Sequence, residues 1–251
     1  MKFFTYWEGK KTPYIELCYE TMKRHIPDII RLDENTAGYY VDLPPEYYKI
    51  KEINHRVDYL KAKLIHKYGG FWLDADTIVM KPLTEDLYYQ KEYVGCPGFF
   101  GAPKGSKELE RWIEHMDVVI RKKSKFQWAE LILPMVWRDN KHDEVRGIDR
   151  KLLCPFYGEL IREVFFKDKQ ELGDRADSSF VIVLYNYVFP EWFKKATRKE
   201  ILDGNMIISE LFRKSLYGET INRPLPLEDV TLSNVANKLN EIIKYIRYKG
   251  L

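Results

Sequence analysis

The sequence has few cysteines and no long apolar run. Its three cysteines, Cys18, Cys96 and Cys154, lie far apart and form no CxxC pair, which argues against a disulfide framework and against a structural zinc site. No segment approaches the roughly 18 consecutive apolar residues of a membrane-spanning helix, and the first residues do not have the pattern of a signal peptide. We therefore expect a cytoplasmic protein, at most peripheral to a membrane.

The sequence also lacks an excess of either charge. Its 251 residues include 41 Lys and Arg and 38 Asp and Glu, so the net charge is +3. Because no long basic block is present, we expect no nucleic-acid partner. Small basic clusters near residues 194–195 and 244–249 leave open a peripheral contact with a membrane or with an anionic lipid-linked acceptor.

The residues that are abundant are those of a globular domain. Hydrophobic residues make up 45% of the chain and aromatic residues 15%, which is too rich for a disordered chain and enough to bury a core. No internal repeat or linker divides the sequence. We therefore expect a single domain over residues 1–251.

Strand-like and helix-like patterns alternate in the first part of the chain. Apolar residues predict short strands over residues 2–7 and 29–32, with an amphipathic helix over residues 13–27 between them. A second helix over residues 54–68 ends at a Gly-Gly pair and leads into apolar residues 71–80. This order predicts an α/β fold with a mixed, mostly parallel central sheet flanked by helices.

The later part of the chain has weaker signals. A short strand is expected over residues 93–95, a helix over residues 106–120 and a second helix over residues 128–137. An apolar run predicts a core strand over residues 180–187, and a terminal helix is expected over residues 230–248.

Two acidic residues interrupt the apolar stretch after the Gly-Gly pair. If this stretch is extended, Asp74 and Asp76 leave the same side of the strand with their Cα atoms roughly 6.5–7 Å apart. Two such carboxylates can bind one hard divalent cation, and ligands of α/β sheets gather outside the carboxyl ends of the strands. An Asp-x-Asp pair alone is weak, since composition produces roughly one in a chain of this length. Two surface acids at a strand end remain the alternative.

The preceding helix carries a second polar pair. Asp58 and Lys61 are i, i+3 neighbours on a face separate from the apolar stripe. In one interpretation they bring a carboxylate and an ammonium to the same end of the sheet as Asp74 and Asp76, which suits a substrate with diphosphate and hydroxyl groups. In the other they form an exposed helical ion pair worth a few tenths of a kcal/mol.

Several segments, taken in order, resemble one known family. They are HRVDYLK at residues 55–61, KYGGFWLDADT at residues 67–77, KPL at residues 81–83 and, at the start of the chain, YWEG at residues 6–9. Together they resemble DXD-containing glycosyltransferases of the family 32 and capsular polysaccharide synthesis type. The resemblance covers about the first 110 residues and is most specific in the middle of them.

The resemblance implies a GT-A-like nucleotide-binding fold and a metal-dependent hexosyltransferase of polysaccharide biosynthesis. Such an enzyme transfers a sugar from a UDP- or GDP-sugar, with Mn²⁺ or Mg²⁺ and with retention of configuration, to a glycan, lipid-linked or protein acceptor. Residues 1–110 would bind the nucleotide sugar, and residues 111–251 would form the acceptor part and the C-terminal helix.

The resemblance also implies roles for individual residues. Asp76 would be the principal metal ligand, and Asp74 would share the metal and hold sugar or ribose hydroxyls, so that both are candidate catalytic residues. Asp58 would bind the donor sugar and Trp7 would stack on the base. The full set expected to bind the donor is Tyr6, Trp7, Asp33, Asp58, Lys61 and Gly70, with Phe99 and Phe100 as further flat faces for a ring.

Two positions depart from the family pattern. Val57 replaces the serine before the helix Asp, and Lys61 replaces an arginine, which it cannot match as a bidentate donor. A third protein ligand for the metal stays unassigned. Two alternatives remain open: a haloacid-dehalogenase-type phosphatase, with Asp74 as nucleophile and Asp76 as general acid, and a non-catalytic module that binds sugar nucleotides.

Overall fold

The computed structural model of the chain describes residues 2–83, 92–96, 98–123, 125–132, 145–147 and 179–218. Within these residues the strands are β1 (Phe3–Tyr6), β2 (Ile30–Leu32), β3 (Gly70–Leu73), β4 (Thr77–Val79), β5 (Glu92–Cys96), β6 (Phe99–Ala102), β7 (Val145–Gly147) and β8 (Val181–Val183). The longer helices are α1 (Pro13–His25), α3 (Ile53–Tyr68), α4 (Lys107–Lys122) and α11 (Ile207–Tyr217). The short ones are α2 (Ala37–Tyr40), η1 (Tyr47–Lys49), α5 (Trp128–Ile132), η4 (Asn186–Val188), α9 (Glu191–Lys194) and α10 (Arg198–Asp203).

The central sheet has six described strands in the order β2-β1-β3-β6-β5-β7. Strand β1 pairs in parallel with both β2 and β3, as the β-α-β pattern predicts. Strand β6 is antiparallel to β3 and β5, and β5 is parallel to β7. Three of these five pairings are parallel, so the predicted mixed, mostly parallel sheet is confirmed.

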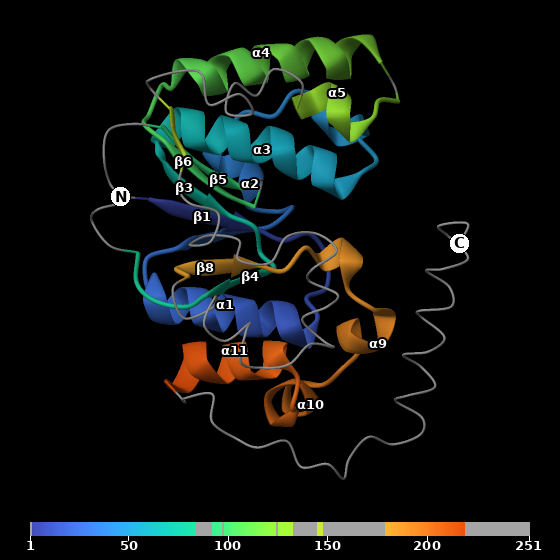
Figure 1. Cartoon of the computed structure of the whole chain (residues 1–251). Coiled ribbons are helices and arrows are strands. Elements are labelled where there is room, and N and C mark those ends of the chain that lie inside the picture. The colour runs from blue at the N-terminus through green and yellow to red at the C-terminus, as the bar shows by residue number, and fades with distance from the viewer. Residues whose placement is uncertain are drawn as a thin grey trace, which may run out of the picture.

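Successive side chains of the strands divide between two cores because strand side chains alternate between the faces of a sheet. Phe4, Trp72 and Phe100 belong to the core beneath α3 and α4. Their neighbours in sequence, among them Phe3 and Phe71, belong to the core shared with α1, β4 and β8. Figure 1 shows α3 and α4 on one side of the sheet and the β4–β8 pair, α1 and α11 on the other.

The prediction of one extended strand through the acidic pair is wrong. Strand β3 ends at Leu73, residues 75 and 76 form a turn, and β4 begins at Thr77 in a separate two-stranded sheet with β8. The ladder between β3 and β6 ends where Leu73 pairs with Phe99. Residues 77–79 pair instead with β8. The alternation of side chains along a single strand does not predict which strand will be its partner.

Other predicted elements are confirmed or corrected by the structure. The helices over residues 13–27, 54–68 and 106–120 and the strand over residues 93–95 are present as α1, α3, α4 and β5. The predicted strand over residues 180–187 is too long, since β8 ends at Val183 and Tyr185 has the left-handed φ of 53° before a 3-10 helix. The stretch over residues 36–53, which has little pattern, contains α2 and η1.

Two predicted helices fall partly or wholly outside the described residues. The helix expected over residues 128–137 is present as α5 up to Ile132, and its remainder lies outside them. The terminal helix expected over residues 230–248 also lies outside them. Among the described residues, no helix combines the length and apolar character needed to cross a membrane.

Candidate functional site

The Gly-Gly pair brings α3 directly onto β3. Gly69 ends the helix with a φ of 67°, and Gly70 begins the strand with a φ of 110°. A Cβ atom on Gly70 would lie 2.1 Å from the carbonyl oxygen of Lys2 in the neighbouring chain segment, which only glycine avoids. The structure therefore gives Gly70 a packing role, and its contact with a cofactor stays a prediction.

The two acids of the Asp-Ala-Asp segment are held by different parts of the chain. Asp74 is the first residue after β3, and its Oδ1 accepts a 2.7 Å hydrogen bond from the indole N–H of Trp72. The Oδ2 of Asp76 accepts a hydrogen bond from the backbone N–H of Asn186. The carbonyl of Asp76 accepts a second bond, 2.8 Å long, from the N–H of Leu184. The segment after β8 therefore fixes Asp76, although it lies 110 residues away in sequence.

Helix α3 contributes a buried ion pair. Asp58 is 5% exposed and Lys61 is 3% exposed, and Lys61 Nζ binds Asp58 Oδ1. The other oxygen of Asp58 accepts a 2.6 Å hydrogen bond from the indole N–H of Trp128 in α5. The alternative of an exposed helical ion pair is therefore wrong, because both charges are removed from water by the packing of α3.

Sequence reasoning did not find Trp128 or Asn186. Their contacts span 70 and 110 residues of sequence, and neither residue stands in a motif. No local signal in the chain points to them, since their roles follow from the packing of distant segments.

Lys61 interacts electrostatically with all three acids, and its ion pair is with Asp58. Burial lowers the pKa of Lys61, but Asp58, Asp74 and Asp76 together raise it by more, so that the lysine stays charged. Burial raises the pKa of Asp74 although Lys61 opposes the shift. Burial, and then the charge of Asp74, raise the pKa of Asp76 to about 7. Three carboxylates face one ammonium, which leaves a formal charge of −2 when all are ionised.

This charge and these ligand atoms suit a divalent cation. Buried carboxylates that lack a balancing cation are costly, and carboxylate oxygens are the ligands that Mg²⁺ and Mn²⁺ prefer. The described residues contain no group of three His, Cys, Asp or Glu side chains able to hold a metal. Asp74 and Asp76 would therefore provide two ligands and leave the others to phosphate oxygens and water, as is usual for Mg²⁺.

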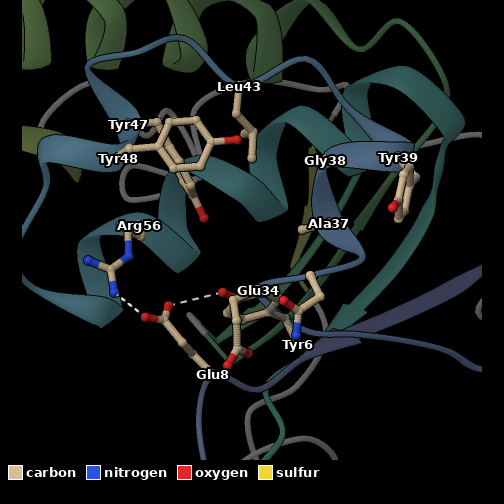
Figure 2. A pocket seen from close by; sticks show the side chains of 11 residues that line it. Tyr6, Glu8, Glu34, Ala37, Gly38, Tyr39, Leu43, Tyr47, Tyr48 and Arg56 are labelled. Atoms are coloured by element: carbon tan, nitrogen blue, oxygen red, sulfur yellow. Dashed lines mark hydrogen bonds and ion pairs between the residues drawn. The ribbon is translucent and has the colours of Figure 1, made fainter.

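A cavity of about 570 Å³ lies at the ends of β1 and β2. We call it the edge cavity; its lining residues are Tyr6, Glu8, Glu34, Asn35, Ala37, Gly38, Tyr39, Leu43, Tyr47, Tyr48 and Arg56. Figure 2 shows Glu8 between Arg56 and Tyr6. Glu8 forms an ion pair with Arg56 and accepts a 3.0 Å hydrogen bond from the Tyr6 hydroxyl. The edge cavity is therefore polar on one side and aromatic on the other.

The remaining residues expected to bind the donor are placed differently. The Trp7 indole donates to the carbonyl of Lys10 at 3.3 Å, packs on the cores beside α1 and does not line the edge cavity. Asp33 follows β2 and accepts hydrogen bonds from Thr36, which lower its pKa. Phe99 and Phe100 are 0% and 1% exposed, so the expectation that they present flat faces to a ring is wrong.

Three of the solved structures that the chain resembles are distant glycosyltransferases. The first is a glycosyltransferase involved in the glycosylation of the major capsid of PBCV-1, with 9% identity, a TM-score of 0.48 and coverage of 77% of this chain and 96% of that chain. The second is the glycosyltransferase GlyE of Streptococcus pneumoniae, with 14% identity, a TM-score of 0.48 and coverage of 86% and 64%. The third is an active-site mutant of LgtC, with 14% identity, a TM-score of 0.46 and coverage of 89% and 98%.

Comparison of the sequence with known protein families identified a family. No curated protein matches the chain. The family model described as capsular polysaccharide synthesis protein matches residues 2–145, a region that begins with β1 and includes α3, the Gly-Gly pair and the Asp74–Asp76 turn. Because this match takes in more than half of the chain, the protein belongs to the capsular polysaccharide synthesis protein family.

Proposed function

We propose that the protein is a metal-dependent, retaining glycosyltransferase with a GT-A-like fold. It would transfer a sugar from a UDP- or GDP-sugar to a glycan, a lipid-linked or a protein acceptor. The observation that carries the proposal is the group formed by the buried Asp58, Lys61 and Asp76 and the half-buried Asp74 at the carboxyl end of β3. Its formal charge of −2 and its oxygen ligands suit a divalent cation with a diphosphate.

Each residue of this group has a distinct task in the proposal. Asp74 and Asp76 would hold Mn²⁺ or Mg²⁺, which would neutralise the charge that builds on the departing diphosphate. Asp58 is oriented on one oxygen by Lys61 and on the other by Trp128, and it accepts hydrogen bonds from hydroxyl groups of the donor sugar. Lys61 fixes the direction of the Asp58 carboxylate through their ion pair.

The backbone N–H of Asn186 has a supporting task. It holds one oxygen of Asp76, which would leave the other oxygen of this carboxylate for the cation. Ligand carboxylates are commonly fixed in this way by hydrogen bonds from outside the coordination shell. The acceptor would enter beside residues 111–251, which form the second part of the proposed single domain.

The family match favours the transferase over the phosphatase and over a non-catalytic module. It spans the Asp74–Asp76 turn and α3 together, and the phosphatase would leave the buried pair on α3 without a task.

The decisive assay is a panel of nucleotide sugars with Mn²⁺ or with EDTA, measured as release of nucleoside diphosphate. We expect release with at least one UDP- or GDP-sugar and its loss in EDTA. Asp76→Asn should abolish release and leave the fold intact, because an asparagine oxygen still accepts from Asn186. The matched control is Asp28→Asn, at an exposed position, which should keep full activity. Metal-independent phosphate release from phosphomonoesters, without use of any nucleotide sugar, would contradict the proposal.

A further inference from the structure

The edge cavity lies at the same end of the sheet as the proposed donor site. Phe4 in β1 pairs with Trp72 in β3, and two residues further on come Tyr6 and Asp74. Tyr6 is the last residue of β1 and Asp74 is the first residue after β3, so both lie at the same end of these two parallel strands. A nucleoside attached to a diphosphate at Asp74 and Asp76 would therefore extend toward the edge cavity, which Tyr6 lines.

Helix α3 contributes one residue to each place. Arg56 lines the edge cavity, and Lys61 forms the ion pair with Asp58. These residues are five positions apart in one helix, which corresponds to about 7.5 Å along its axis and about 140° around it. The two places therefore lie at similar heights along α3 but on different sides of the helix.

The two carboxylates of the edge cavity differ in the ion pairs and hydrogen bonds that they already form. Glu8 is neutralised by Arg56 and bonded by the Tyr6 hydroxyl. Glu34 accepts bonds of 3.3 and 3.4 Å from the N–H of Gly9. A carboxylate has about four lone-pair sites, so Glu34 keeps acceptor capacity for a ligand in the cavity.

Aromatic side chains lie on other parts of the lining. Tyr39 is 85% exposed and Tyr48 is 66% exposed, and Figure 2 shows them on separate segments around the cavity. Exposed rings stack on flat bases, and this stacking discriminates little between bases. The volume of about 570 Å³ lies within the range of small-molecule sites and leaves room for a purine.

We infer that the edge cavity binds the base of the donor and that Glu34 selects guanine over uracil, so that the donor is a GDP-sugar. This inference rests on the proposed function. Guanine presents two adjacent donors, N1–H and N2–H, which match the two oxygens of one carboxylate. Uracil presents a single N–H between two carbonyl oxygens, and a carboxylate repels both of them. Tyr48 supplies stacking for either base.

The test measures binding of GDP and of UDP to the full chain in Mn²⁺ by calorimetry. We expect GDP to bind at least about tenfold more tightly than UDP. Glu34→Gln should weaken GDP about tenfold and leave UDP within about twofold, because the amide offers a donor where guanine needs an acceptor. Tyr48→Leu should weaken both nucleotides by a similar factor of about five or more.

The matched control is Glu16→Gln, at an exposed glutamate of α1 outside the edge cavity, which should leave both affinities unchanged. If UDP binds as tightly as GDP and UDP-sugars are turned over, the inference fails while the proposed function stands. The inference also fails if Glu34→Gln binds GDP as tightly as the wild type does. If no nucleoside diphosphate binds and no nucleotide sugar is used, both fail.

Discussion

The buried ion pair on α3 gives the sharpest prediction about stability. Lys61→Met keeps the length and packing of the side chain but removes the ammonium. The side chains of Lys61 and Asp58 are 4% and 7% exposed, so Asp58 would be left as a buried charge without its cation. Removing one partner of such a pair costs about 3–5 kcal/mol, whereas an exposed helical pair contributes about 0.3–0.5 kcal/mol.

The assay is equilibrium unfolding in urea, with EDTA present so that bound metal does not add stability. For a chain of this size the dependence of the unfolding free energy on urea is about 3 kcal/mol per molar. The midpoint of Lys61→Met should therefore fall by about 1–1.7 M with an unchanged slope. The decrease should follow from the lost cation alone, because methionine fills nearly the same volume.

The matched control is Lys199→Met, which breaks another helical Lys–Asp pair with side chains 88% and 63% exposed. Its midpoint should not shift measurably. If Lys61→Met behaves like Lys199→Met, the pair on α3 is exposed in solution. The group with Asp74 and Asp76 would then not exist as described.

Three further predictions concern the supports of the site. Gly70→Ala should destabilise the protein by more than about 2 kcal/mol in thermal unfolding, because its Cβ would lie 2.1 Å from a backbone carbonyl at a φ of 110°. Tyr14→Phe should weaken Mn²⁺ binding about tenfold in calorimetry, because the Tyr14 hydroxyl donates to the side-chain oxygen of Asn186, whose backbone N–H holds Asp76. Burial lowers the pKa of His25, so the unfolded state binds more protons and stability is lost as pH falls through about 6.5. His25→Gln should remove that part of the pH dependence in urea unfolding.

Each of these predictions has a control or a contrary outcome. Gly38→Ala should change stability little, since a Cβ there meets nothing within 4 Å. Tyr39→Phe, at an exposed tyrosine, should leave Mn²⁺ affinity unchanged. If Tyr14→Phe binds Mn²⁺ as the wild type does, the bond to Asn186 does not orient Asp76. Identical pH curves with and without His25 would show that its burial has no effect on stability.

Much of the fold could be predicted because its signals are local. Helical spacing of apolar residues predicts α1 and α3, and the glycine after Tyr68 predicts the end of α3. The apolar run of β3 places Asp74 at the carboxyl end of a strand. The order of these elements predicts the parallel pairing of β1 with β2 and β3.

Other features could not be read from the same stretches of sequence. The chain leaves the central sheet after Leu73 because β6 ends its pairing there and β8 offers a new partner. Both partners lie far along the chain, so the Asp-Ala-Asp segment itself gives no sign of the turn. The left-handed Tyr185, which precedes the N–H that holds Asp76, is equally unexpected in an apolar run.

The sequence by itself determined the α/β order of elements, the Asp74–Asp76 pair at a strand end and the pairing of Asp58 with Lys61. Only the tertiary structure decided that Asp58 and Lys61 are buried, that Trp128 and Asn186 hold two of the acids, and that a cavity opens at the ends of β1 and β2. The physical reason is the range of the interactions. Backbone conformation and helical spacing depend on neighbouring residues, whereas burial and the partners of a charge depend on segments that meet only after the chain has folded.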